Sequence, residues 1–277
     1  MSRTGGEEDK RSNYHGQKEE HSSQGATRDS AFIPEQLPAL DPAKCPNAPQ
    51  SNVEVVNSAS FTAARKLINQ VPDAKGKMSV LNLASDEDRA GGWIYTLSKT
   101  QEEALCYSST LYETLKLSYY PWSNVGPGSV AGVFSPGVVI FKDDLDHGCR
   151  DLASEEREVV SVITVAAPRG PTLTKDRQSF RVPSVLEDLR GKIRLVYRMA
   201  AHNGQSYMIL GAMGCGAYRC PSRLVAEQMK EILLEPEFKG WFHRVVFAVY
   251  SHPSTYETNF DVFSEVFRDT TIGDSPA

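Results

Sequence analysis

Two adjacent carboxylates stand out as groups that could transfer a proton. Glu102 and Glu103 close the stretch SDEDRAGGWIYTLSKTQEE, residues 85–103. Successive helix positions point about 100° apart, so the pair cannot flank one bond as a usual glycosidase pair does. At most one of them therefore transfers a proton, while the other orients a ligand. A capping box with Thr100 as N-cap and Glu103 at the third helical position also fits, and the residues alone favour that structural interpretation.

Two glycine-containing segments could bring backbone N–H groups close to a phosphate or a ribose. A Gly-Gly pair at 91–92 precedes the helix of the two carboxylates, and three more glycines lie in LGAMGCGAYRCP, residues 210–221. Glycine lets the backbone approach a ligand closely, and unpaired N–H groups hold anions without Lys or Arg. Each segment alone is weak evidence, because glycine after a strand usually marks only a turn.

Other reactive side chains have simpler explanations. His147 and Cys149 have metal-ligand chemistry, but no second pair at zinc-site spacing accompanies them, so we expect no metal. Cys215 and Cys220 lie at the second glycine segment without a particular histidine, which argues against a thiol nucleophile. Trp93 could stack on a base or a ribose, although packing is the commoner role of such an aromatic residue.

The elements that must position these residues alternate between buried strands and amphipathic helices. Strands are expected at residues 78–84, 130–142, 159–167, 207–213 and 245–250. Helices are expected at residues 62–70, 100–117, 183–201, 222–234 and 259–267. This alternation predicts a three-layer α/β fold with a sheet covered on both faces. Ligands bind such folds at the carboxyl ends of strands, where both glycine segments fall.

Composition indicates one large domain with an N-terminal appendage. The 277 residues include 30 Lys+Arg and 35 Asp+Glu, and the net charge of −5 argues against nucleic-acid binding by general electrostatics. The first thirty residues are almost devoid of apolar side chains, and a proline-rich stretch follows. We therefore predict a disordered tail and Pro-rich linker over residues 1–50 and a folded domain over 51–277 that begins near Asn52.

The sequence suggests neither a membrane nor a secretory route. No apolar run approaches the roughly 18–20 residues of a membrane span, and no apolar segment follows the N-terminal charges as in a signal peptide. Five scattered cysteines do not form a disulfide framework. We expect an intracellular protein, cytoplasmic or nuclear, that acts as a monomer without direct contact with nucleic acid or membrane.

The stretch VLNLASDEDRAGGWIYTLSKTQEEALCYSSTLY, residues 80–112, resembles the signature of the microbial-type poly(ADP-ribose) glycohydrolases, a branch of the macrodomain family. That signature is a glycine triplet, a short spacer and Gln-Glu-Glu. Here Ala90-Gly91-Gly92 takes the place of the triplet and Gln101-Glu102-Glu103 supplies the acidic pair. Three further segments resemble the family in the same order: FSPGVVIFKDD (134–144), VSVITVAAP (160–168) and LGAMGCGAY (210–218). The resemblance spans roughly residues 55–268.

This resemblance implies a macrodomain, a three-layer α/β/α fold with a mixed, mostly parallel sheet. It also implies hydrolysis of the ribose–ribose O-glycosidic bonds of poly(ADP-ribose) to release ADP-ribose, without a cofactor. By position, Glu103 would be the catalytic acid and base, and Glu102 would hold ribose hydroxyls. The residues expected around the distal ribose are Asp88, Ala90, Gly91, Gly92, Gln101 and Tyr218. Those expected at the diphosphate are Gly214, Cys215, Gly216 and Ala217.

The first glycine segment departs from the family pattern. Where the family reads Asn-Pro-Gly-Gly-Gly, this chain has an aspartate at Asp88, which when ionised can only accept hydrogen bonds, and a methyl group at Ala90. A second interpretation therefore stays open, a macrodomain that binds ADP-ribose without cleaving it. Neither a Walker loop nor a G-x-G-x-x-G motif supports another nucleotide-binding enzyme. Arg169 and Arg219 could contact phosphate or simply lie on the surface.

Overall fold

Seven strands form one mixed sheet in the order β1-β5-β6-β4-β7-β8-β3. This computed structural model describes residues 29–95, 98, 100–252 and 256–273. The strands are β1 (Ala31–Ile33), β3 (Glu54–Val56), β4 (Met78–Leu83), β5 (Gly132–Ile140), β6 (Glu158–Val165), β7 (Tyr207–Leu210) and β8 (Arg244–Ala248). Every pairing is parallel except those of β5 with β1 and β6. A separate two-stranded ribbon joins β2 (Ser51–Asn52) to β9 (Thr271–Ile272).

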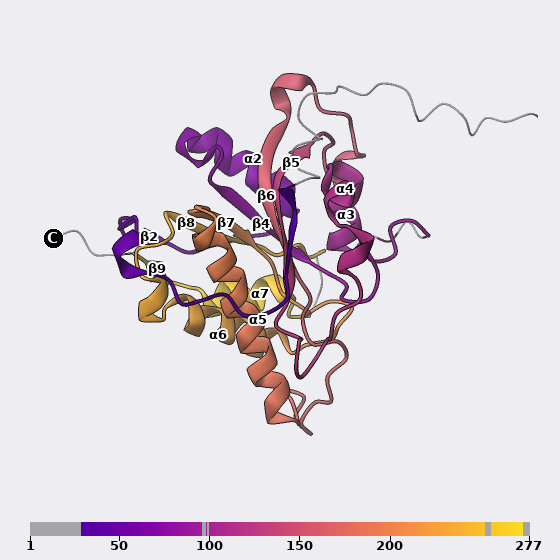
Figure 1. Cartoon of the computed structure of the whole chain (residues 1–277), viewed down its shortest axis with the longest axis vertical. Coiled ribbons are helices and arrows are strands. Elements are labelled where there is room, and N and C mark those ends of the chain that lie inside the picture. The colour runs from indigo at the N-terminus through magenta and orange to yellow at the C-terminus, as the bar shows by residue number, and fades with distance from the viewer. Residues whose placement is uncertain (1–28, 96–97, 99, 253–255, 274–277) are drawn as a thin grey trace, which may run out of the picture.

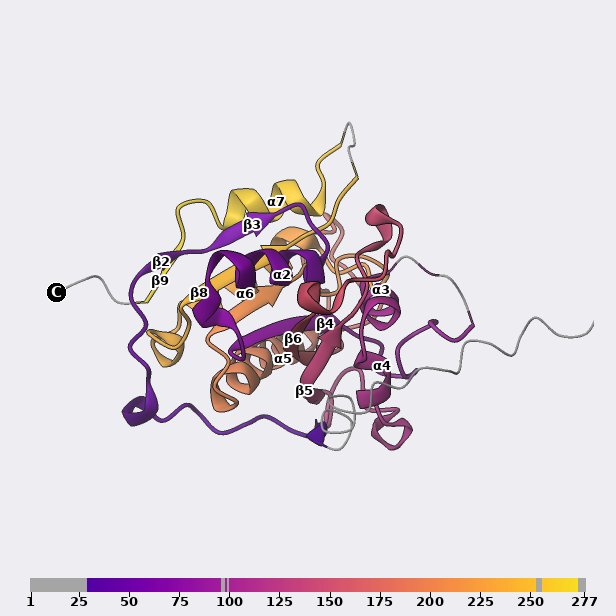
Figure 2. The same ribbon diagram turned by 90° about the horizontal axis from the view of Figure 1, so that it is seen from above.

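Helices cover both faces of this sheet, which confirms the predicted three layers (Figures 1 and 2). One face carries α5 (Pro183–His202), α6 (Ser222–Leu233) and α7 (Asn259–Val266), and the other carries α2 (Ser60–Gln70), α3 (Gln101–Ser108) and α4 (Leu111–Thr114). Successive residues of one strand enter opposite cores: Val80 packs with α2 and α3, whereas Leu81 packs with α5 and α6. Strands buried on both faces are apolar along most of their length, and all five predicted strands are confirmed.

The predicted helix over residues 100–117 is wrong as a single element. It ends at Ser108, and the short α4 follows after a break. Ser109 is extended and forms a bridge to Ile140 of β5, while Thr110 exchanges hydrogen bonds with Val139. The hydroxyl of Ser109 also donates to the carbonyl of Leu105. Pairing with β5 therefore replaces the helical hydrogen bonds at this point.

The fold begins well before the predicted boundary near Asn52. The apolar triplet of β1 pairs with β5, whose edge would otherwise be open, and both Leu40 and Ala48 are buried. The predicted disordered tail falls mostly on residues 1–28, which lie outside the described residues. The proline-rich segment is extended, as expected, but it belongs to the folded domain.

Hydrogen bonds to the backbone and side chains of α5 hold this N-terminal segment along that helix. Gln36 Nε2 donates to the carbonyl of Gly191 at 2.9 Å, and Arg198 Nη1 donates to the carbonyl of Leu37 at 2.7 Å. Figure 2 shows the indigo segment running past the layer of α5 after β1. Within the described residues, no helix is long and apolar enough to cross a membrane.

Candidate active site

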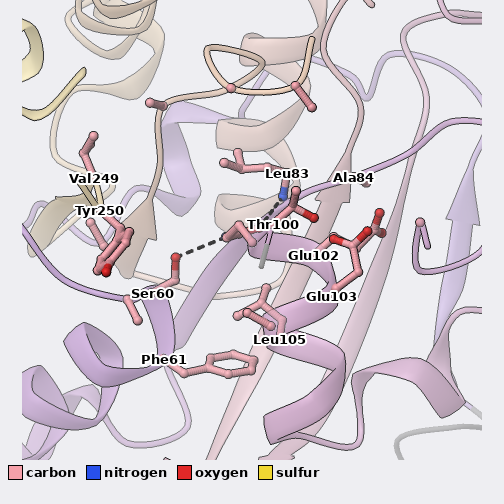
Figure 3. Close-up of a pocket in the computed structure, with 18 of the residues that line it drawn as sticks. Ser60, Phe61, Leu83, Ala84, Thr100, Glu102, Glu103, Leu105, Val249 and Tyr250 are labelled. Carbon is pink, nitrogen blue, oxygen red and sulfur yellow. Dashed lines mark hydrogen bonds between the residues drawn. The ribbon is translucent and has the colours of Figure 1, made fainter. Parts of the chain in front are cut away.

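A cleft of about 860 Å³ opens where the parallel strands end. Parallel strands bring their carboxyl ends to one edge of the sheet, so loops far apart in sequence meet there. The lining comes from parts of the segments 83–88 after β4, 167–169 after β6, 212–218 after β7 and 248–252 after β8, and from the start of α3. Figure 3 shows Glu102 and Glu103 at the start of α3, with Val249 and Tyr250 across the pocket. Both predicted glycine segments therefore reach one site.

Glu102 is buried and fixed by hydrogen bonds to both of its carboxyl oxygens. Asn82 Nδ2 donates to Oε1 at 3.0 Å, and the N–H of Ser85 donates to Oε2 at 2.8 Å. Burial raises the pKa of Glu102 to about 8; the two hydrogen bonds oppose the shift, and nearby carboxylate charge adds to it. Glu102 therefore keeps a proton at neutral pH.

Glu103 is held through one oxygen only. Its Oε1 accepts the N–H of Gly92 at 2.9 Å, and Oε2 has no hydrogen-bond partner within the described residues. The side chain lines the cleft, so Oε2 is the carboxyl oxygen of the pair that can meet a ligand. The predicted capping box is wrong, because Thr100 makes no side-chain cap and Glu103 bonds to the glycine segment instead.

The two carboxyl groups converge on Gly91 although their helix positions diverge. Gly91 has a φ of +56°, and a Cβ atom there would lie 2.8 Å from Glu103 Oε1 and 3.2 Å from Glu102 Oε2. A side chain would therefore collide with both carboxyls in a backbone conformation that favours glycine. Glycine at this position is what lets the segment close over the acidic pair.

Gln101 positions the acidic pair, and its amide leaves no N–H donor for a ligand. Its Oε1 accepts the N–H of Leu83 at 2.8 Å, and its Nε2 donates to the carbonyl of Leu81 at 2.7 Å and to Ser60 Oγ at 3.1 Å. These three bonds tie the first turn of α3 to the end of β4 and to α2. Gln101 also lines the cleft, so its predicted contact with the substrate stays a prediction beside this positioning role.

Of the remaining residues of the first glycine segment, some line the cleft and others lie behind its wall. Asp88 is exposed and lines the cleft, whereas Ala90 and Gly92 lie behind it. Ala90 is fully buried with a φ of +58°, a left-handed conformation that costs a non-glycine residue roughly 1–2 kcal/mol. Arg89 does not face the carboxylates, because its guanidinium lies 3.7 Å from the ring centre of Tyr112.

The second glycine segment is shaped by Gly214 and presents open backbone donors. A Cβ atom at Gly214 would lie 2.5 Å from Ala167 Cβ, and its φ is +74°. The N–H groups of Gly216, Ala217 and Tyr218 have no acceptor in the described part of the chain, and all three residues line the cleft. Consecutive N–H groups of this kind hold anions without a basic side chain.

Cys215 is the exception among the predicted residues of this segment. Its N–H donates to the carbonyl of Ala212 at 3.1 Å, its thiol lies 3.6 Å from the carbonyl oxygen of Met213, and it does not line the cleft. Burial raises the pKa of the Cys215 thiol, which agrees with the prediction that it is no nucleophile. The predicted backbone contact of Cys215 with the diphosphate stays a prediction, although that N–H is already bonded within the segment.

A buried network joins the two glycine segments, and the sequence analysis missed it. Asp86 is 1% exposed; its Oδ1 accepts Tyr218 Oη at 3.1 Å and Asn124 Nδ2 at 2.9 Å, and its Oδ2 lies 3.5 Å from Arg169 Nη2. Lys192, fully buried in α5, donates to the carbonyl of Asn124, and burial lowers the pKa of Lys192 to about 8. In a run of four charged residues, Asp86 carried no signal that distinguished it from a surface acid.

The other candidate side chains have structural partners. Trp93 packs on the ring of Tyr112 at 4.2 Å between centroids, which confirms packing. His147 does meet two acids within 4.8 Å, Asp143 and Asp144. Asp143 forms ion pairs with Arg65 and with Arg150, whereas Asp144 accepts from His147, so these side chains tie α2 to the segment after β5.

Comparison with known proteins gives one consistent family. Residues 9–143 match the family model of the microbial-type PARG catalytic domain, where PARG is poly(ADP-ribose) glycohydrolase. The match starts before the region 55–268 that the motifs indicated, in keeping with the folded N-terminal segment. Among curated protein sequences, none matches the chain.

Solved structures resemble the chain over most of its length. The PARG of Deinococcus radiodurans in complex with ADP-ribose is 27% identical with a TM-score of 0.72, over 88% of this chain and 96% of that one. The PARG of Thermomonospora curvata is 28% identical with a TM-score of 0.71, over 88% of each chain. The same enzyme bound to the inhibitor ADP-HPD is 29% identical with a TM-score of 0.69, over 88% and 87%.

Proposed function

The chain belongs with the microbial-type poly(ADP-ribose) glycohydrolases, and from that premise we propose that its cleft hydrolyses ribose–ribose O-glycosidic bonds of the polymer with Glu103 as acid and base. One observation carries the choice of Glu103. Both oxygens of Glu102 are bonded to the protein, whereas Glu103 Oε2 has no partner among the described residues and belongs to a side chain that lines the cleft. Reach to the substrate decides the role before pKa does.

The chemistry needs a proton for the leaving group and a base for water. Glu103, in its acid form, donates its own proton from the cleft-facing carboxyl to the glycosidic oxygen as the bond to the anomeric carbon breaks through an oxocarbenium-like state. Water then attacks that carbon, and Glu103 takes up the proton that the water loses. A neutral Glu102 can offer its own proton to a ribose hydroxyl.

The rest of the cleft suits the remainder of ADP-ribose. The open N–H groups of Gly216, Ala217 and Tyr218 support binding of the diphosphate. Tyr218, held by Asp86, would pack against the distal ribose beside Gly91. Burial raises the pKa of Tyr218 to about 12, so its hydroxyl stays protonated and donates to Asp86.

The test compares Glu103→Gln with wild type by polymer turnover and by calorimetric titration of ADP-ribose. We expect turnover to fall about 10²–10⁴-fold, because a positioned acid–base group contributes that much, while ADP-ribose affinity stays within a few-fold. The matched control is Glu113→Gln, which changes an exposed glutamate of α4 that does not line the cleft. Wild-type turnover in Glu103→Gln would refute the assignment of Glu103. Binding without turnover in wild type would instead identify a reader, with Asp88 and Ala90 as the cause.

We also propose that the protein works as a monomer inside the cell. All five cysteines are free, as in a reducing compartment, which supports the intracellular part of this proposal. Sedimentation of the purified protein with and without ADP-ribose tests the oligomeric state.

A further inference from the structure

A second, basic pocket lies beside the cleft. It has a volume of about 470 Å³ and is lined by Lys175, Arg177 and Arg219 together with uncharged residues between 170 and 174. All three cationic residues are exposed, and none makes an ion pair with any residue that the structure describes. Three uncompensated cations around one hollow are notable in a chain with a net charge of −5. Such a cluster attracts an anion.

The backbone beneath two of these cations is strained. Arg177 has a φ of +61° and Arg219 a φ of +58°, and a turn hydrogen bond closes at each: Arg177 N–H to Thr174 O at 2.9 Å and Arg219 N–H to Gly216 O at 3.0 Å. Left-handed backbone costs a non-glycine residue roughly 1–2 kcal/mol, so glycine would be more stable at both positions. Both places carry arginine, and both line the same pocket. Retained strain of this kind points to function.

The pocket is displayed on a fixed hairpin. Leu173 bridges to Phe180, the N–H of Thr174 donates to the carbonyl of Ser179, and Phe180 is buried in the core. The acid of this hairpin, Asp176, is held by the Thr174 hydroxyl at 2.6 Å and by the N–H of Gln178, away from ion pairing. The backbone that carries Lys175 and Arg177 is therefore fixed without a ligand, so only their side chains lose conformational entropy on binding.

The pocket and the cleft share a wall. Arg169 and Tyr218 line the cleft, and the residues that follow them, Gly170 and Arg219, line the pocket. The N–H of Gly170 donates to the carbonyl of Tyr218 at 2.9 Å, which joins the two halves of this wall. Neighbouring Cα atoms are about 3.8 Å apart, so an extended polyanion that leaves the cleft past Tyr218 comes directly to the basic pocket.

We propose that this basic pocket binds the diphosphate of the ADP-ribose unit that adjoins the one in the cleft. The inference rests on the proposed function and adds to it a preference for substrates of two or more units over a single ADP-ribose. Arginine is suited to the role because its planar guanidinium pairs with phosphate through two parallel hydrogen bonds. The uncharged remainder of the pocket leaves room for the ligand without a competing carboxylate.

The test is the double variant Arg177→Gly with Arg219→Gly, made in the Glu103→Gln background so that polymer is not consumed. Glycine relieves both strained positions, so the variant is expected to fold at least as stably as its parent. We expect the Kd for polymer of defined length to rise about tenfold and the slope of log K against log salt to fall by roughly 1–1.5 for two lost phosphate contacts. The Kd for single ADP-ribose should stay within twofold. The control, Lys44→Gln with Arg268→Gln, removes two exposed cations that line neither pocket.

Three results would overturn the proposal. The first is unchanged polymer affinity in the double variant, and the second is an equal loss for single ADP-ribose and for polymer. The third is a parent protein that binds single-stranded DNA of matched charge as tightly as polymer and loses both equally in the double variant, which would make the pocket a general phosphate site. A parent protein that binds neither ADP-ribose nor polymer would refute the proposed function itself, and the calorimetric titration of the parent shows this separately.

Discussion

The two glycine segments at the mouth of the cleft look alike in sequence and do opposite things with their backbone N–H groups. In the first segment, Ser85 and Gly92 donate to the carboxyl groups of Glu102 and Glu103. In the second, Gly216 and Ala217 keep their N–H groups open, within the described residues, at the cleft wall. The first segment therefore shapes the acid pair, and the second keeps open the donors that the proposed diphosphate site requires.

At two of the glycines in these segments, a side chain is excluded by neighbouring atoms of the protein itself. At Gly91 the neighbours are two carboxyl groups, and at Gly214 they are Ala167 and Cys220. At Gly216 there is nothing within 4 Å of a built Cβ atom, although this glycine lies on the cleft itself. Substitutions at these three positions should thus separate acid positioning, loop packing and ligand contact.

Gly91→Ala should have the largest effect. The new Cβ atom would lie 2.8 Å from Glu103 Oε1 at a φ of +56°, so the acid pair must move. We expect turnover to fall at least about 100-fold and stability to fall by roughly 2–4 kcal/mol from overpacking and backbone strain together. Polymer turnover and thermal unfolding measure the two effects. Gly76→Ala, with a φ of +77° and nothing within 4 Å, isolates the strain; equal losses in both variants would disprove the role of the carboxyl contact.

Gly214→Ala and Gly216→Ala sharpen the comparison within the second segment. A Cβ atom at Gly214 would lie 2.5 Å from Ala167 Cβ, so we expect about 2–3 kcal/mol of destabilisation and weaker ADP-ribose binding as the loop shifts. Gly216→Ala meets no neighbour and leaves its N–H in place, so its ADP-ribose affinity should change by less than about threefold. Calorimetric titration of ADP-ribose into both variants measures the two affinities. A greater loss of affinity in Gly216→Ala than in Gly214→Ala would show that the side-chain space at Gly216, and not the packing of Gly214, is needed for binding.

Glu102→Gln tests the electrostatics of the first segment through pH. Burial raises the pKa of Glu102 from 4.5 to about 8, so wild type is stabilised by the bound proton at low pH and loses that contribution as pH rises from about 4.5 through 8. The amide variant does not titrate. Between pH 5 and pH 9 its stability relative to wild type should therefore rise by roughly 4 kcal/mol, since one pKa unit corresponds to about 1.4 kcal/mol. Denaturant unfolding across this range measures it, and parallel curves would contradict a raised pKa.

Sequence patterns within single elements were sufficient to predict most of the strands and the position of the cleft. Mostly apolar runs predicted β4 and β6 on both sides of the first segment, and strand ends predicted where the cleft would open. The family resemblance supplied the roles predicted for the acid pair. These signals are local, so one stretch of sequence contains them.

The features that sequence missed all depend on a distant partner. The triplet of β1 is too short for a periodic pattern and becomes a strand only on the edge of β5. The break at Ser109 needs the same strand, and the carboxylate of Asp86 is distinguished only by distant partners such as Tyr218, which is 132 positions away. Backbone conformation is equally hidden from the sequence. The residue type tells what a positive φ at Ala90 would cost, but only the structure shows that Ala90 has one.

Ala90→Gly should have the smallest effect, and it asks whether the first segment limits catalysis. Ala90 is fully buried at a φ of +58°, so glycine removes strain and also a packed methyl group. The strain relief of roughly 1–2 kcal/mol exceeds the value of about 1 kcal/mol for one buried methyl group, so stability should change by less than about 1 kcal/mol, in the stabilising direction. Because Gly92 N–H already holds Glu103 behind this turn, turnover should stay within about threefold of wild type. A large gain in polymer turnover would instead show that the methyl group at Ala90 holds the acid pair out of place, and that the first segment restrains the enzyme.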